Sequence, residues 1–238
     1  MTRCIDCAAD QLASGWYFVR IVRENPTPKI DHARVVAGAV ELADGIGVDA
    51  LTMRKLAEHL GTKPMTIYHY VANKEAIIDG MVDAVVAEIE LPRVDEPWRP
   101  GVERRARSAR DALVRHRWAA PLIDSRRHPG PATLRHHDTM IGIHRHHGFD
   151  LPGTAHSIAL TDAYVYGFAL QQANLPATGG DEMAELADDV GEQMPAGQYP
   201  HLEDFMRDHA LAAGYEFGDE FETGLAIVLD GIEASFGP

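Results

Sequence analysis

The chain has 238 residues, of which 45% are hydrophobic and 24% are charged, and its formal net charge is −14. This is ordinary globular composition, so extensive disorder is excluded, and the length allows one large or two modest domains with a full core. No run approaches the roughly 18 apolar residues that a membrane span needs, and the first residues do not resemble a signal peptide, so we expect a cytoplasmic protein.

Residues 1–28 form an N-terminal extension that ends in Pro26-Thr27-Pro28. Both cysteines of the chain, Cys4 and Cys7, lie in it and form a Cys-x-x-Cys pair, which provides no disulfide framework. Such a pair binds metal or cycles redox when a second pair or a βαβ context accompanies it, and the sequence has neither. A plain tail is the favoured interpretation, and a metal or redox sensor or an arm that reaches DNA are the alternatives.

The next segment has the pattern of a helix-turn-helix. Asp31 is positioned to cap a first helix, and Thr52 is positioned to cap a second one that ends at Gly61, where a positive φ costs glycine nothing. Pro64 suits the first position of a third helix, which we expect to include Met65–Tyr70 and to act as the recognition helix. Asn73 is then expected to cap a long helix.

The charge of this segment supports contact with DNA. Residues 52–74 carry four cations and one anion, a local net charge of +3 in an acidic chain. Phosphate contacts need such a local patch, whatever the overall charge. The alternative is a pair of packed helices with a solvated cationic face, since this geometry also occurs without DNA.

Three motifs follow one another in this segment: Leu-Thr-Met-Arg-Lys-Leu-Ala-Glu-His-Leu-Gly, Thr-Ile-Tyr-His-Tyr-Val and Asn-Lys-Glu-Ala-Ile-Ile. Together they resemble the DNA-binding domain of the tetracycline-repressor family, and the resemblance covers residues 30–89. The resemblance implies DNA contacts by Thr66, Tyr68 and Lys74. Arg54 is a candidate donor to the edge of a guanine, and His69 and Tyr70 are candidate contacts to the DNA backbone. Lys63 stands where the family commonly has a small capping residue, so it is a further candidate for DNA contact. The full set of expected DNA-binding residues is Thr52, Arg54, Lys63, Thr66, Tyr68, His69, Tyr70 and Lys74.

Beyond a boundary near residue 92, marked by Pro92, Pro97 and Pro100, only helical signals are present, so we expect an all-α protein. The expected domains are a helix-turn-helix head at 29–91 and a larger helical regulatory and dimerisation domain at 92–238. Helices are expected over 102–117, 118–127, 131–147, 154–174 and 217–236. The acidic stretch around Gly179-Gly180 and Pro195 is expected to be loose and mobile.

Charge is unevenly distributed in this second domain. Residues 98–147 carry eleven arginines against four acids, whereas residues 181–238 carry fifteen acids against one arginine. We expect the two blocks to be complementary surfaces, within one monomer or across a dimer, with a solvated acidic face as the alternative.

Several segments of this domain, including Tyr-Gly-Phe-Ala-Leu-Gln at 166–171, resemble the family's regulatory domain. The resemblance implies that the helices over 154–174 and 217–236 pair with their twins in a four-helix dimer interface, with ordinary core as the alternative for each apolar stripe. Candidates for a small-molecule pocket, chosen for apolar bulk with a few polar groups, are Trp118, Ile123, Met140, Ile143, Tyr164, Phe168 and Gln171.

Five histidines cluster at positions 136, 137, 144, 146 and 147. Only two or three of these rings can share a helix face, so solvated histidines are favoured over a metal site. The chain has no Gly-rich phosphate loop, no nucleophile elbow and no paired-carboxylate motif in context, so we expect neither catalysis nor a cofactor.

These patterns predict a dimeric, ligand-responsive transcriptional repressor that binds a near-palindromic operator and is released from it by a small molecule. The alternative is a metal-dependent helical enzyme, or a metal or redox sensor, that uses the histidines or the Cys4–Cys7 pair.

Overall fold

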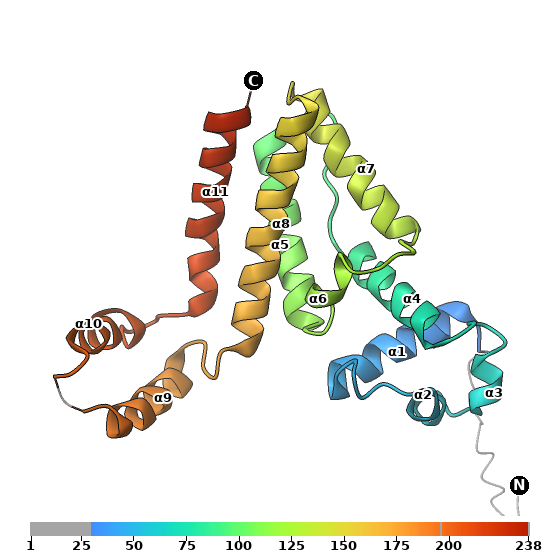
Figure 1. Ribbon diagram of the computed structural model, residues 1–238, viewed down its shortest axis with the longest axis horizontal. Helices are drawn as coiled ribbons and strands as arrows, with labels where there is room; N and C mark the ends of the chain where they lie inside the picture. The colour runs from blue at the N-terminus through green and yellow to red at the C-terminus, as the bar shows by residue number, and fades with distance from the viewer. Residues whose placement is uncertain (1–29, 196, 238) are drawn as a thin grey trace, which may run out of the picture. The chain divides into compact units, whose positions relative to one another are not determined.

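The computed structural model describes residues 30–195 and 197–237 (Figure 1). Within these residues the chain is helical with no strand, which confirms the all-α prediction, and residues 31–238 form one compact unit. One isolated β-bridge pairs Gly179 with Glu216. The expectations for residues 1–28, including those for Cys4 and Cys7, lie outside the described residues.

Four helices form the head, and their N-caps are those predicted. The side-chain oxygens of Asp31, Thr52 and Asn73 each accept a hydrogen bond from the backbone amide three residues further on, at 2.8, 3.2 and 2.9 Å. Gly61 has a φ of +64° and ends the second helix as expected. The helices are α1 (His32–Ile46), α2 (Met53–His59), α3 (Pro64–Ile67) and α4 (Lys74–Ala87).

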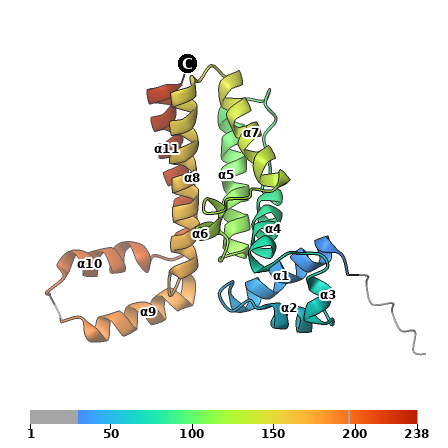
Figure 2. The same ribbon diagram turned by 45° about the vertical axis from the view of Figure 1, so that its right-hand side comes forward.

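The body is built on α8, which packs against α5 on one side and α11 on the other (Figures 1 and 2). Helix α7 packs against both α8 and α4, so it joins the head to the body. Branched and aromatic side chains fill the core between these helices, among them Val165, Phe221 and Leu225. The body helices are α5 (Trp98–Arg115), α6 (Ala120–Ile123), α7 (Pro131–His146), α8 (Leu151–Asn174) and α11 (Glu220–Phe236).

Two helix boundaries differ from the sequence-based expectation. Helix α5 begins at Trp98, before the expected residue 102, because Pro100 falls in the first turn, where a missing amide leaves no hydrogen bond unmade. The helix expected over 118–127 is reduced to the single turn of α6, and Pro129 and Gly130 then lead into α7. Trp118 precedes that turn and donates its indole N–H to Asp44 Oδ1 of α1 at 2.7 Å.

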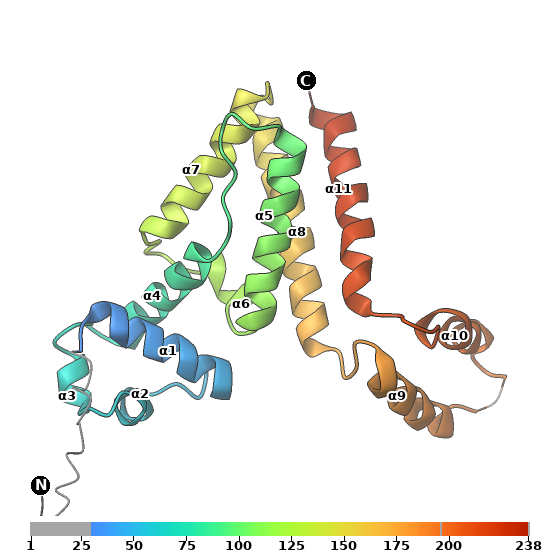
Figure 3. The ribbon, with the colours of Figure 1, turned by 180° about the vertical axis from the view of Figure 1, so that it is seen from behind.

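The acidic stretch, expected to be loose, is largely helical in its described residues (Figure 3). Asp181 and Glu182 lie in the first turn of its first helix, where their charge favours the helix N-terminus. Neither of its two α-helices buries a residue. The segment comprises α9 (Gly180–Gln193), α10 (Pro200–Phe205), a π-helical turn (Met206–Ala210) and a 3₁₀ turn (Phe217–Asp219). Its mobility stays a prediction.

The opposite charge blocks meet within one chain. Arg99 of α5 pairs with Asp230 at 2.7 Å and with Glu233 at 2.8 Å, both on α11, and Arg107 pairs with Glu222 at 2.7 Å. These pairs are substantially exposed, so each adds little to stability, but they link α5 directly to α11. The interpretation as complementary surfaces is therefore confirmed for α11, whereas in the described part of the chain the acids of α9 and α10 form no ion pair with the arginines of residues 98–147.

Candidate nucleic-acid interface and ligand pocket

The small helices α2 and α3 are held by a shared apolar core. Leu56 of α2 and Ile67 of α3 are both fully buried, and Val71 closes the core behind α3. Packing of these side chains fixes the turn between the helices and turns the remaining face of α3 outward. Met65 is 69% exposed and Tyr68 is 45% exposed on that face, which is a large apolar and aromatic area for so short a helix.

The third helix is shorter than predicted. Its α-helical part ends at Ile67, and Tyr68, His69 and Tyr70 lie in the turn that follows. Backbone bonds from His69 N to Thr66 O (3.3 Å) and from Tyr70 N to Ile67 O (2.9 Å) tighten the chain to a three-residue spacing. This spacing changes the angular positions of the two tyrosines from those of a regular helix, while both stay at the surface.

The structure brings the eight expected DNA-binding residues to the surface of one small region. Thr66 and Lys74 are half-buried, and the other six are exposed. Arg54 pairs with Glu58 at 3.2 Å, but its side chain is 85% exposed, so this weak pair leaves the guanidinium available for another partner. Met65, which the sequence placed in the recognition helix but not among the DNA-binding residues, is the most exposed of the large apolar side chains in this region.

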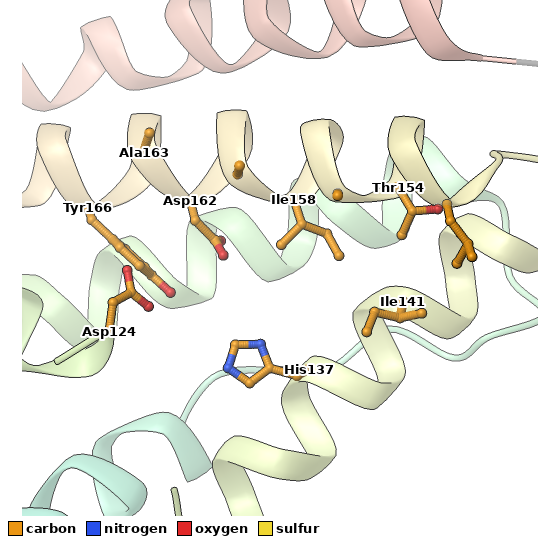
Figure 4. A pocket seen from close by; sticks show the side chains of 11 residues that line it. Asp124, His137, Ile141, Thr154, Ile158, Asp162, Ala163 and Tyr166 are labelled. Carbon is orange, nitrogen blue, oxygen red and sulfur yellow. The ribbon is translucent and has the colours of Figure 1, made fainter. Parts of the chain in front are cut away.

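A pocket of about 590 Å³ opens between α7 and α8 (Figure 4). Its long wall is α8, its opposite wall is α7, and the residue after α6 closes one end. The lining residues are Asp124, His137, Ile141, Leu151, Thr154, Ala155, Ile158, Ala159, Asp162, Ala163 and Tyr166. A volume of this size accommodates a drug-sized molecule.

A buried arginine lies behind the polar end of the pocket. Arg105 of α5 is fully buried, pairs with Asp162 and donates from Nε to His136 Nε2 at 2.9 Å. His136 is therefore a neutral acceptor, and burial, followed by the charge of Arg105, lowers its pKa from the usual 6.5 to about 3. Burial likewise raises the pKa of Tyr166 to about 12, so its phenol stays protonated and can donate a hydrogen bond.

Asp124 faces this end from the opposite side (Figure 4). Although the residue as a whole is exposed, desolvation of its carboxyl is the main cause that raises its pKa, and the charge of Asp162 adds to it. The end of the pocket thus combines two carboxylates, a phenol and the imidazole of His137. Sequence analysis singled out His137 only as one of the clustered histidines and Tyr166 only as part of the segment at 166–171, and it did not select any of these four residues for a ligand site.

The seven sequence-predicted ligand residues do not line this pocket. Met140 and Ile143 are core residues of α7, at 2% and 0% exposure, and Ile123 borders a smaller pocket next to α4. Trp118 donates a hydrogen bond to Asp44, and the hydroxyl of Tyr164 donates to Phe221 O at 2.9 Å. Phe168 is stacked on Phe217, and Gln171 is exposed. Their role in ligand binding stays a prediction.

The histidine cluster is divided among several environments. His144 is buried between Met140 O (2.6 Å) and Ser157 Oγ (2.7 Å), and His147 donates from Nε2 to Glu96 O at 2.7 Å. Within residues 30–195 and 197–237, no three histidine, cysteine or acidic side chains are grouped as metal ligands.

In the same described part of the chain, no helix combines the length and apolar character needed to cross a membrane.

The region next to the pocket is tied to α4 by ion pairs. Arg126, two residues after Asp124, bonds Asp79 at 2.6 Å and Glu75 at 2.8 Å. A second connection runs through His116, which follows α5 and contacts Asp44 of α1 at 2.9 Å and Glu88 beyond α4 at 3.1 Å. The head is therefore attached to the body near both ends of α4.

Comparison with known proteins agrees with this architecture. Residues 35–81 match the model of bacterial regulatory proteins of the tetR family, and residues 91–236 match the tetracyclin repressor-like C-terminal domain. The chain is 31% identical to the HTH-type transcriptional repressor DrrR1 of Streptomyces coeruleorubidus, over 92% of this chain and 83% of the relative. It is 30% identical to the class A tetracycline repressor from transposon 1721 of Escherichia coli, over 86% of this chain and 91% of the relative.

A solved structure gives the same result. The crystal structure of the TetR family protein ActR of Streptomyces coelicolor in complex with actinorhodin aligns with a TM-score of 0.69 and 28% identity, covering 88% of this chain and all of the other. The chain therefore belongs to the tetracycline repressor family of bacterial transcriptional regulators. It is a helix-turn-helix regulator with a helical body of the kind found in ligand-responsive repressors.

Proposed function

We propose that this chain acts in the cytoplasm as a homodimeric repressor that binds double-stranded operator DNA and leaves it when a small molecule occupies the body. Residues 29–91 serve as the DNA-binding domain, residues 92–238 serve as the regulatory and dimerisation domain, and residues 1–28 are an extension. The observation that carries the proposal is the cationic, outward-facing surface of α2 and α3 in a strongly acidic chain. The proposal involves no catalytic step and no cofactor.

The eight surface residues divide by the chemistry they offer DNA. Lys63 and Lys74 neutralise phosphates without regard to sequence, whereas Arg54 supplies a paired donor that suits a guanine edge. The hydroxyls of Thr52, Thr66, Tyr68 and Tyr70, with the ring of His69, reach phosphate oxygens or base edges. Met65 offers an apolar contact for a thymine methyl group.

The exposed face of α8 supports dimerisation. Leu160, Ala163, Gly167 and Leu170 recur on that face at helical spacing, and the two leucines are 49% and 41% exposed. A Cβ placed on Gly167 meets nothing within 4 Å, so the monomer itself has no need of a glycine that costs roughly 0.5–1 kcal/mol in a helix interior. Close approach of a second copy's helix supplies the reason.

Helix α11 also has an exposed apolar position and an open glycine. Ile227 is 66% exposed, and Gly231, one turn further on, also has open space at its Cβ position. Thr161, Val165 and Phe168 of α8 are instead buried within the monomer, so these three residues are core. For this part of α8 the alternative of ordinary core holds, and the proposed dimer surface lies on the face that carries Leu160 and Gly167.

The pocket between α7 and α8 is the proposed effector site. The ActR structure with actinorhodin is a related case in which a body of this kind is described with a small molecule. An effector that contacts Asp124 and His137 lies next to the attachments of α4, and α4 packs against α1 of the head. Its effect on the operator is limited by the difference in its affinity for the DNA-bound and released states.

A titration of the full chain with the DNA upstream of its own gene tests the proposal. Fluorescence anisotropy is compared with unrelated DNA of equal length and base composition, and footprinting locates the protected sites. The proposal expects tight binding to the upstream DNA and two protected half-sites about one helical turn apart. Equal, weak binding to both DNAs rejects it.

A further inference from the structure

The pocket has one-sided charge. Two of its lining residues, Asp124 and Asp162, are acidic, and none is lysine or arginine. The buried Arg105 behind the wall pairs with Asp162, so that carboxylate is matched within the protein. The charge that the pocket presents to a ligand is therefore set by the carboxylate of Asp124.

Asp124 takes part in no side-chain ion pair or hydrogen bond with any described residue. The nearest cation along the chain, Arg126, is committed to Asp79 and Glu75. Asp124 is partly desolvated, which is why its pKa is raised. An ionised carboxylate in this position has lost part of its hydration, and no protein cation compensates for that loss.

The rest of the pocket is apolar and adjoins that carboxylate. Ile141 from α7 and Ile158 from α8 face each other across it, and small alanine side chains on α8 leave the space open (Figure 4). The ring of Tyr166 stands beside Asp124, and an aromatic face next to a carboxylate is a favourable place for a cation. One end of the pocket therefore suits an apolar part of a ligand, and the other end suits a positively charged group of the same ligand.

We infer that the effector is an amphiphilic cation, an apolar body with one positively charged amine that pairs with Asp124 against the ring of Tyr166. The inference rests on the proposed function, because it names the class of ligand for the same pocket. A neutral ligand leaves Asp124 unpaired, and an anion is repelled by that carboxylate. Because Asp124 is partly exposed to solvent, the lower end of the range for hydrogen bonds to charged groups applies, about 1.5 kcal/mol, which corresponds to about a tenfold preference for the cation.

Three flat three-ring probes of similar size test the class directly: the cation proflavine, neutral acridone and the anion anthracene carboxylate. Each is titrated by fluorescence against the full chain without DNA. The inference expects proflavine to bind about tenfold more tightly than acridone, with anthracene carboxylate weakest. Asp124→Asn should reduce the preference for proflavine to less than about threefold, while Asp138→Asn, which removes an exposed carboxylate of α7 outside the pocket, should leave it intact.

Equal or tighter binding of acridone or of the anion overturns the inference, as does a proflavine preference that survives Asp124→Asn. Binding of none of the three probes also overturns it. Operator binding of the same preparation is measured in parallel, so that a regulator with a different ligand class is distinguished from a chain that does not bind DNA at all.

Discussion

Asp83 of α4 caps the N-terminus of α7 through Thr133. One carboxylate oxygen of Asp83 accepts from the backbone N–H of Thr133 at 2.8 Å and from its hydroxyl at 2.9 Å, and the other accepts from Ala132 N at 3.2 Å. A carboxylate here meets both the unpaired amides and the positive end of the helix dipole. The same helix presents His137 to the pocket one turn later, so α4 and the pocket wall share a hydrogen-bonded junction.

Removing this cap should weaken the start of α7. For Asp83→Ala, we expect the free energy of unfolding to fall by about 1–2 kcal/mol, as for other lost N-caps. Hydrogen exchange of a peptide that contains Ala132 and Thr133 should accelerate, because both amides lose their acceptor. The matched control is Asp138→Ala on α7. Unchanged exchange in Asp83→Ala would show that the cap does not order this turn.

Gly130 makes a sharper test of the same junction. A Cβ at this position would lie 2.2 Å from the Asp83 carboxylate carbon, so Gly130→Ala should displace the cap and destabilise the protein. In an Asp83→Ala background the obstacle is gone, and the same change should become neutral or stabilising by up to about 1 kcal/mol, since alanine restricts the unfolded chain. Urea unfolding of the four proteins measures this. Equal effects in both backgrounds contradict the prediction.

The proposed dimer surface can be tested at Gly167. Gly167→Leu should shift the protein from dimer to monomer, because a Cβ at this position points into open space in one chain, whereas a leucine there blocks a close helix approach in the pair. Sedimentation velocity over a concentration series reads this directly. Gly191→Leu, at an equally open helical glycine of α9, is the control and should remain dimeric. A Gly167→Leu dimer as tight as the native one would place the interface elsewhere.

His136 should contribute to acid sensitivity. Its pKa is about 3 in the folded protein against the usual 6.5, so the unfolded chain binds the proton more readily in this range. The free energy of unfolding should therefore fall as the pH drops from 6.5 toward 3, by up to about 1.4 kcal/mol per pH unit from this residue. His136→Gln retains an acceptor for Arg105 and should flatten that slope. His146→Gln, at an exposed position, should retain it.

Local rules predicted the head well. The caps at Asp31, Thr52 and Asn73 depend on residues three positions away, and a sequence shows such spacings directly. The end of α3 at Ile67 escaped prediction because the following turn is set by packing of Val71 into the core. Boundaries of this kind depend on tertiary contacts rather than on propensity.

The pocket could not be derived in the same way. Selection by apolar bulk found Met140 and Ile143, which fill the core, whereas an open site needs small residues such as Ala159. The pair formed by Arg105 and Asp162 joins residues 57 positions apart, so neither residue indicates its partner from the sequence. The burial that shifts the pKa of His136 arises from the same distant contacts.

The salt dependence of operator binding tests the central claim most directly. The affinity for the upstream DNA is measured at several salt concentrations for the native chain, Lys74→Ala and Tyr68→Phe, with Arg135→Ala on α7 as the control. The account predicts steep salt dependence, a slope reduced by about one in Lys74→Ala, weaker discrimination from unrelated DNA in Tyr68→Phe, and no change in the control. Identical slopes and affinities for all four proteins would contradict the claim that α2 and α3 form the DNA-reading surface.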